Sequence, residues 1–216
     1  MADPILERYA PLYSSLVSDC AETAGLGPRA AREGLEPFHT EPLAVAVGRA
    51  HTIQARRTDE RVEIDMLLEA VEATPPDAVV VVAVDEEPHV ALWGGLMTTA
   101  VRKRGARGAV VDAGIRDLHQ ILPTGFPVWA RYRLPLDIRG RAEIVSYGEP
   151  VVFGGVPVAP GDLVFADANG VVVVPAASEQ EVLALAEERV AREVATDREL
   201  EGGARPSEVY ERHGAF

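Results

Sequence analysis

Between Trp93 and Asp117 the sequence reads WGGLMTTAVRKRGARGAVVDAGIRD, a stretch that combines a Gly-Gly pair, a short apolar run and an Arg-Asp pair. Its apolar spacing predicts a helix over residues 96–104 and a strand over 109–111. Just before it, the run DAVVVVAV at 77–84 predicts a buried strand. Strand, helix and strand in this order form a βαβ crossover with parallel strands. The loops that follow such strands open on one side of the sheet, where α/β proteins generally bind ligands.

The polar residues of this stretch fall in or just after those two loops. Gly94 and Gly95 open the predicted helix, whose first amide groups lack internal partners and can receive an anion. Arg116 can hold a planar oxyanion, and Asp117 can bind a hard metal ion. Taken singly, these features are typical of an ordinary turn and of a solvated ion pair. Their placement in one βαβ unit predicts a site for an anionic substrate.

Four segments carry a resemblance to a known family: GGLMTTAVRKRGARGAVVDAGIRD at 94–117, GFPVWARY at 125–132, VVFGGVPVAPGDLVFADANGVVVVP at 151–175 and GGARPSEVYERHG at 202–214. With them the chain resembles the RraA-like family. That family groups the regulator of ribonuclease E activity A with class II aldolases of 4-hydroxy-4-methyl-2-oxoglutarate and 4-carboxy-4-hydroxy-2-oxoadipate. Its most specific element is a Gly or Asp followed, after twenty residues, by Arg-Asp. Gly95, Arg116 and Asp117 match this spacing.

The resemblance implies a role for each of these residues. Asp117 would ligate a divalent ion, Mg²⁺ or Mn²⁺, and Arg116 would bind the keto oxygen of a pyruvate unit. The backbone amides of Gly95, Leu96 and Met97 would bind its carboxylate. The residue types suit this chemistry, because a guanidinium and a metal ion can stabilise the pyruvate enolate formed when a carbon–carbon bond breaks beside a 2-oxo acid.

Further residues near the Arg-Asp pair are candidates for the surroundings of the metal: Asp112, His119 and Gln120. Asp112 has an alternative role as a loop-capping residue, and the family does not require a His at position 119. Gln120 replaces an acid of the aldolase pattern, which removes a charge. A short polar Asp-Asn element typical of the family is also missing between residues 57 and 66. Lys103, the only lysine, is expected on an exposed helix face, which argues against Schiff-base chemistry.

Composition restricts the function classes. The chain has 216 residues, 47% of them hydrophobic, and a formal charge of −13. The negative charge and the absence of a basic run disfavour nucleic acid and anionic membranes as partners. No apolar run reaches the length of a membrane span, the N-terminal residues lack a signal pattern, and the single Cys20 is expected to pack against a helix. We therefore expect a cytoplasmic protein.

The fold expected from the resemblance is α/β, a swivelling β/β/α sandwich of the RraA-like type, formed by residues 1–216 as one domain. Helical spacing predicts one or two helices over about 3–24 and a long helix over about 178–200, followed by a tail. Ser178 and Glu181 suggest a capping box for the long helix. A strand is expected over 43–54. The resemblance further implies a homotrimer, or a dimer of trimers.

Three function classes remain open. The first is a divalent-metal-dependent lyase, a class II aldolase or oxaloacetate decarboxylase, that acts on 2-oxo dicarboxylic acids through a pyruvate enolate. The second is a non-catalytic, protein-binding regulator. The third is an enzyme of another reaction type on the same site, suggested by Gln120 and the altered 57–66 segment.

Overall fold

The structure is a computed structural model that describes residues 3–39, 41, 44–86 and 88–214. The α-helices are α1 (Pro4–Tyr9), α2 (Ser14–Thr23), α3 (Asp65–Glu72), α4 (Gly95–Lys103), α5 (Leu118–Ile121), α6 (Glu179–Glu201) and α7 (Pro206–His213). The strands are β1 (Glu36–Pro37), β2 (Ala46–Arg57), β3 (Ala78–Val84), β4 (Ala91–Trp93), β5 (Gly108–Ile115), β6 (Val128–Arg133), β7 (Ala142–Tyr147), β8 (Val151–Phe153), β9 (Val156–Val158), β10 (Leu163–Asp167) and β11 (Gly170–Val174).

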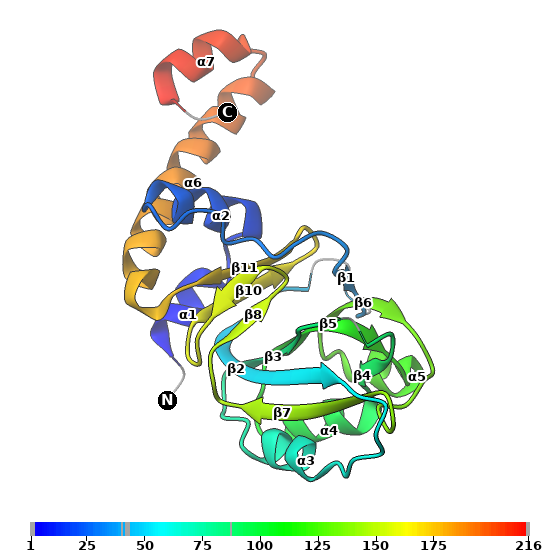
Figure 1. Cartoon of the computed structure of the whole chain (residues 1–216). Helices are drawn as coiled ribbons and strands as arrows, with labels where there is room; N and C mark the ends of the chain where they lie inside the picture. The colour runs from blue at the N-terminus through cyan, green and yellow to red at the C-terminus, as the bar shows by residue number, and fades with distance from the viewer. Residues whose placement is uncertain (1–2, 40, 42–43, 87, 215–216) are drawn as a thin grey trace.

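One mixed sheet organises the molecule (Figure 1). Its strands follow the order β1-β6-β5-β3-β2-β10-β11, with β4 paired to β5 and β7 paired to β2. The central strands β2, β3, β5 and β6 are parallel, whereas β10, β11, β7 and β1 add antiparallel pairs. The predicted βαβ crossover is present, since β3 and β5 are parallel neighbours and α4 lies between them in the chain.

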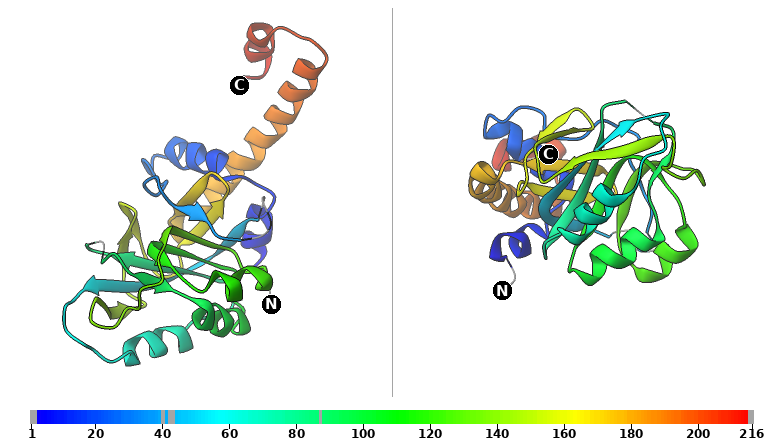
Figure 2. Two further views of the ribbon diagram at one scale, coloured as in Figure 1. Left: turned by 90° about the vertical axis from the view of Figure 1, so that its right-hand side faces the viewer. Right: turned by 60° about the horizontal axis from the view of Figure 1, so that its bottom comes forward.

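Two layers cover the centre of the sheet. Helices α3 and α4 lie side by side on one face, as both views of Figure 2 show, over a core that includes Val80, Val82 and Val111. The β8–β9 hairpin covers the other face and buries Phe153 against Val81. Alternate residues of β3 thus enter opposite cores, as the two-residue period of a strand requires. The result is the β/β/α sandwich expected from the sequence.

A third core lies over β10 and β11. Helices α1, α2 and α6 pack there, and Cys20 is buried among them as predicted. α6 then continues away from the sheet, and α7 folds back beside its end (Figures 1 and 2). The capping-box prediction was wrong, because the side chain of Ser178 caps no α6 amide and a short 3₁₀ turn (Ala176–Ser178) precedes the helix.

The observed bounds of two strands differ from the predicted ones. The strand expected over 43–54 begins at Ala46 and runs to Arg57, and Leu43 lies outside the described residues. The strand expected over 109–111 extends to Ile115, because its later residues pair with β4, which the sequence analysis did not predict. In the described part of the chain, no helix is long and apolar enough to cross a membrane.

Candidate active site

The site begins where β4 and β5 end together. Trp93 and Ile115 are register partners in these parallel strands, and the Arg116 amide donates to the Trp93 carbonyl at 3.0 Å. The residues that follow each strand therefore emerge at the same level. On one side the chain enters α4 through Gly94, and on the other it enters the Arg116-Asp117 loop. This pairing brings together two segments more than twenty positions apart.

Both glycines allow this close approach. A Cβ atom on Gly94 would lie 2.9 Å from Asp117 Oδ2, and one on Gly95 would lie 2.0 Å from Gln120 Oε1. Neither glycine has a positive φ, so space and not backbone conformation requires glycine here. The Gly-Gly pair is thus more than a turn, because a side chain at either position would displace a predicted site residue.

Asp117 adopts a left-handed conformation, with φ of 60°. Asp tolerates this region better than most residues, at a cost of the order of 1 kcal/mol. The conformation turns its carboxylate towards the start of α4, where Oδ2 lies 3.4 Å from the Gly95 amide nitrogen. Asp117 therefore occupies part of the anion site predicted at this helix end. The amides of Leu96 and Met97 belong to the same first turn, which has no intrahelical acceptors.

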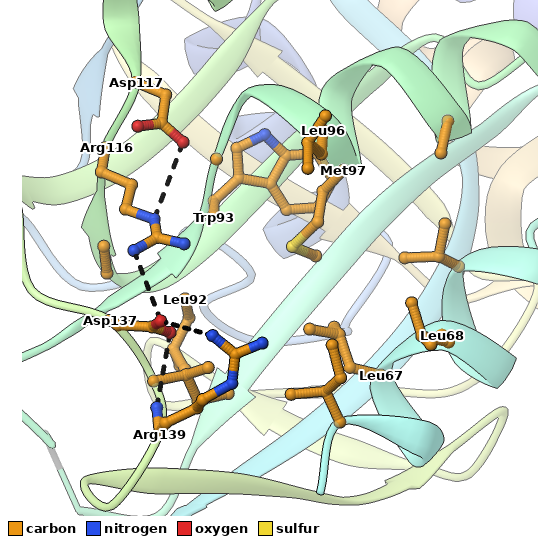
Figure 3. Close-up of a pocket in the computed structure, with 16 residues that line it drawn as sticks. Leu67, Leu68, Leu92, Trp93, Leu96, Met97, Arg116, Asp117, Asp137 and Arg139 are labelled. Carbon is orange, nitrogen blue, oxygen red and sulfur yellow. Dashed lines mark hydrogen bonds and ion pairs between the residues drawn. The ribbon is translucent and has the colours of Figure 1, made fainter.

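Arg116 lies between two carboxylates, as Figure 3 shows. Its Nε is 3.7 Å from Asp117 Oδ2, and one terminal nitrogen is 3.9 Å from Asp137 Oδ2. Asp137 also accepts from Arg139, at 2.9 Å. Burial would raise the pKa of Asp137, but the Arg139 backbone amide and the charges of Arg116 and Arg139 outweigh it, so this pKa lies below its ordinary value. The ion pairs of Arg116 are long and leave its guanidinium available to a ligand.

These groups form one wall of a cavity of about 430 Å³. Small-molecule sites commonly have volumes of about 300–1,000 Å³. The opposite wall comes from α3 and α4 and includes Leu67, Leu68 and Met97 (Figure 3). The Trp93 indole N–H donates to Thr98 Oγ1 at 2.8 Å, so the ring presents its apolar surface to the cavity.

Most of the residues predicted for the site lie together. Leu96, Met97, Arg116 and Asp117 line the cavity, and Gly95 contacts Asp117 beside it. Gln120 packs over Gly95 and is exposed to solvent.

Other candidates lie elsewhere. Asp112 points to the hairpin face of the sheet, where it accepts from Arg131 and from the Gly154 amide, so its suggested place beside the metal was wrong. Its neighbours Val111 and Ala113 belong to the core on the helix face, and a strand turns alternate side chains to opposite faces. His119 is exposed and does not line the cavity. Lys103, the last residue of α4, is exposed, as expected.

Three parts of the site were not predicted from the sequence: Asp137, Arg139 and the α3 wall. Asp137 and Arg139 follow β6 in a loop with no regular spacing, and only their alternation of acid and base, DIR at 137–139, marks them. The sequence of α3 shows only the apolar spacing of an ordinary amphipathic helix. Nothing local distinguishes a leucine that lines a cavity from one that packs in a core.

The side chains around Asp117 offer only oxygen donors. In the described part of the chain, no group of three or more His, Cys, Asp or Glu residues could enclose an ion. The available donors are the Asp117 carboxylate and the nearby amide oxygen of Gln120. This set fits Mg²⁺ or Mn²⁺ held through Asp117 with water completing the coordination, since Mg²⁺ often keeps several waters. It does not fit Zn²⁺, which takes three or four nitrogen or sulfur ligands.

The fold and the site define an α/β protein with a small-molecule cavity at the ends of parallel strands. The model of the RraA-like family, described as Aldolase/RraA, matches residues 14–173. The chain therefore belongs to the RraA-like family.

Three known proteins are similar to this chain. A protein of Halalkalibacterium halodurans, provisionally named a 4-hydroxy-4-methyl-2-oxoglutarate aldolase, is 30% identical over 76% of this chain and 76% of its own length. Protein DlpA of Legionella pneumophila is 30% identical over 96% of this chain, which spans only 34% of DlpA. The crystal structure of Streptomyces coelicolor RraAS2, an unusual member of the RNase ES inhibitor RraA family, is 27% identical, covers 91% of this chain and 97% of its own, and superposes with a TM-score of 0.79.

Proposed function

We propose that this chain is a divalent-metal-dependent lyase that breaks a carbon–carbon bond beside a 2-oxo acid and releases pyruvate. The observation that carries the proposal is the position of Arg116 and Asp117 in the cavity wall beside the first turn of α4. Two reactions share the required enolate: retro-aldol cleavage of a 4-hydroxy-2-oxo acid and decarboxylation of oxaloacetate. The aldolase names of several relatives support the same class.

Each residue of the site has one role in the proposed reaction. The amides of Leu96 and Met97 bind the substrate carboxylate at the positive end of α4. Arg116 donates to the keto oxygen and stabilises the negative charge that this oxygen gains, an effect commonly worth about 10²–10³ in rate for one donor. Asp137 holds Arg116 in place without neutralising it at close range. When bound through Asp117, Mg²⁺ or Mn²⁺ would supply further Lewis-acid stabilisation of that oxygen.

The retro-aldol step balances without a redox partner. The hydroxyl proton passes from the oxygen on C4 to a water molecule, the C3–C4 bond breaks, and its electron pair enters the pyruvate enolate. Protonation at C3 then yields pyruvate, and C4 leaves as a carbonyl compound. In decarboxylation the leaving group is carbon dioxide, and the same enolate forms.

Pyruvate release from a panel of 2-oxo acids tests the proposal. We expect turnover with Mg²⁺ or Mn²⁺, loss of turnover in excess chelator, and a loss of at least about a hundredfold in Arg116→Lys, because an ammonium group lacks the guanidinium fork. Arg102→Lys, on the exposed side of α4, is the matched control. Asp117→Asn should also weaken Mn²⁺ binding measured directly by calorimetry. Pyruvate formation unchanged in Arg116→Ala would refute the mechanism.

A regulatory role is the second candidate, favoured by the similarity to RraAS2. A regulator would bind its partner through outer surfaces, so inhibition of a ribonuclease would survive Arg116→Ala. Measuring ribonuclease inhibition and pyruvate release in the same two proteins separates the candidates. A lyase loses pyruvate release in the variant, and a regulator keeps its inhibition.

A further inference from the structure

The cavity is larger and more apolar than a pyruvate unit requires. We infer that the substrate of the retro-aldol reaction is a 2-oxo acid whose far end is an alkyl or aryl group and not a second carboxylate. The inference rests on the proposed function for the 2-oxo acid end, and it replaces the dicarboxylic acid that the sequence resemblance implied. It is carried by the lining of the cavity, the pairing of its cations and the charge of the adjacent helix.

Apolar side chains form most of the lining. Eleven of the sixteen lining residues are apolar: Ile64, Leu67, Leu68, Val71, Ala91, Leu92, Trp93, Leu96, Met97, Ala100 and Ile138. The Arg116 and Asp117 end accommodates the three-carbon head, and the space towards α3 remains for the rest of the substrate (Figure 3). A carboxylate placed against these leucines would lose its hydration without gaining a hydrogen bond.

The cations of the cavity are already paired. Arg116 and Arg139 are its only basic lining residues in the described part of the chain, and both interact with Asp137. Arg116 is assigned to the keto oxygen. A second carboxylate would therefore have to compete with Asp137 for Arg139, whose bond to Asp137 is 2.9 Å long.

The negative charge of α3 also disfavours a second carboxylate on the substrate. This helix carries Asp65, Glu69 and Glu72 on its exposed side and has no basic residue. These carboxylates do not line the cavity, but they lie on the helix that carries Leu67 and Leu68, and they disfavour a second negative charge beside it. They have no such effect on an alkyl or aryl group.

The cavity rim also exposes large apolar side chains. Leu68 is 49% exposed and Leu96 is 82% exposed, and both line the cavity. Burying such groups against an apolar ligand is favourable by about 25 cal/mol per Å². A bound alkyl or aryl tail would cover them, so the rim and the interior of the cavity both favour an apolar ligand.

Binding of three uncleavable 2-oxo acids tests the inference independently of catalysis. The probes are pyruvate, 2-oxoglutarate and 2-oxooctanoate, measured by calorimetry with Mg²⁺ present. We expect 2-oxooctanoate to bind at least about tenfold more tightly than 2-oxoglutarate, because each buried methylene contributes about fourfold. Leu68→Lys, at a half-exposed position that tolerates the change, should reverse the order by adding a cation to the apolar wall. Met66→Lys is the control, since Met66 lies on the same helix outside the cavity lining.

Turnover separates this inference from the proposed function. The substrates are a 4-hydroxy-2-oxo acid with an alkyl end and one with a carboxylate end, assayed for pyruvate. Tight binding of 2-oxooctanoate without pyruvate release from either substrate would refute the proposed lyase function. It would still support a ligand with an apolar far end. Pyruvate release with a preference for the carboxylate substrate would refute the inference of an apolar substrate end and leave the proposed lyase function intact. Leu68→Lys altering the oligomeric state but not the ligand order would assign these leucines to a subunit interface and also overturn it.

Discussion

At the scale of single residues, the site depends on two glycines that have no room for a side chain. Gly94 approaches Asp117, and Gly95 approaches Gln120, in both cases closer than a Cβ atom permits. The same contacts place the Asp117 carboxylate at the α4 N-terminus. The arrangement of the polar groups in the site thus depends on the absence of a side chain at both positions.

Gly95→Ala should lower the free energy of unfolding by about 1–3 kcal/mol, because the new methyl group overlaps Gln120. Gln120→Gly removes the overlapping atoms, so the double variant should lose less than the sum of the two single losses. Urea unfolding of the four proteins measures this coupling. Additive losses would show that Gln120 does not restrict position 95.

Gln120→Glu restores the acid of the aldolase pattern beside the first turn of α4. The added negative charge should tighten Mg²⁺ binding, because it lies close to the same helix start as Asp117. We also expect retro-aldol cleavage to gain relative to oxaloacetate decarboxylation, which has no alcohol to deprotonate. The measurements are calorimetric Mg²⁺ affinity and the ratio of the two kcat/KM values. An unchanged ratio would show that position 120 does not govern the proton transfer.

At the scale of elements, β2 anchors α3, which forms part of the apolar wall. His51 of β2 is buried, and its Nε2 lies 2.8 Å from the carbonyl of Ala70 in α3. Burial lowers the pKa of His51; the hydrogen bond to the Ala70 carbonyl opposes this shift, and the charge of Arg104 adds to it. The folded protein therefore holds this residue neutral, which attaches α3 to the sheet through one neutral hydrogen bond.

This pKa shift predicts the direction of a pH effect on stability. The unfolded chain protonates His51 near its ordinary value of 6.5, but the folded chain does so only at lower pH. Its contribution is thus complete above about pH 6.5 and is lost as the pH falls, by at most about 1.4 kcal/mol per pH unit. Urea unfolding at pH 7.5 and 5.5 should show a smaller pH difference in His51→Gln than in the native chain. Equal differences would contradict the assignment.

At the scale of the whole molecule, β2 connects the helical layer to the sheet. Its Arg49 forms ion pairs with Asp3, the N-cap of α1, and with Glu179, the first residue of α6. Tyr9 of α1 adds a 2.7 Å hydrogen bond to the Glu179 carbonyl. β2 also supplies residues to all three cores, including Val47, Ala50 and Ile53. We therefore expect the helices and the sheet to unfold as one unit.

Arg49→Met should lower the free energy of unfolding by about 1–3 kcal/mol, because it leaves two partly buried carboxylates without their cation. Arg8→Met is the control, since the Arg8–Glu187 pair is solvent-exposed and should contribute less than about 1 kcal/mol. Thermal unfolding should remain a single transition in both proteins. Two separate transitions would show that the helical layer unfolds independently.

Exposed apolar side chains on the α6–α7 hairpin suggest that copies of this chain associate. Val194 and Tyr210 are 63% and 57% exposed on the part of the molecule that extends from the sheet. We expect a homotrimer, and Val194→Ser with Tyr210→Ser should weaken it if this hairpin forms the contact. Sedimentation equilibrium measures the mass. A native chain that is monomeric at micromolar concentration would contradict the prediction.

The sequence alone predicted the features that depend on local pattern. Apolar periodicity predicted β3, α4 and the start of β5, because residues at strand or helix spacing must share a buried face. The adjacency of Arg116 and Asp117 predicted a polar site after β5, because a parallel strand ends at the ligand-binding edge of the sheet. Family motifs then indicated the sandwich, which the structure shares.

Which side chains meet in the site depends on contacts between segments that are distant in the chain. The pairing of β4 with β5 brought Gly94 beside Arg116, and the loop after β6 added Asp137 to the same wall. The strand face occupied by Asp112 depends on the register of β5, which turned it away from the cavity. Such contacts join segments distant in the chain, and their energies depend on packing and charge between elements that no local spacing specifies.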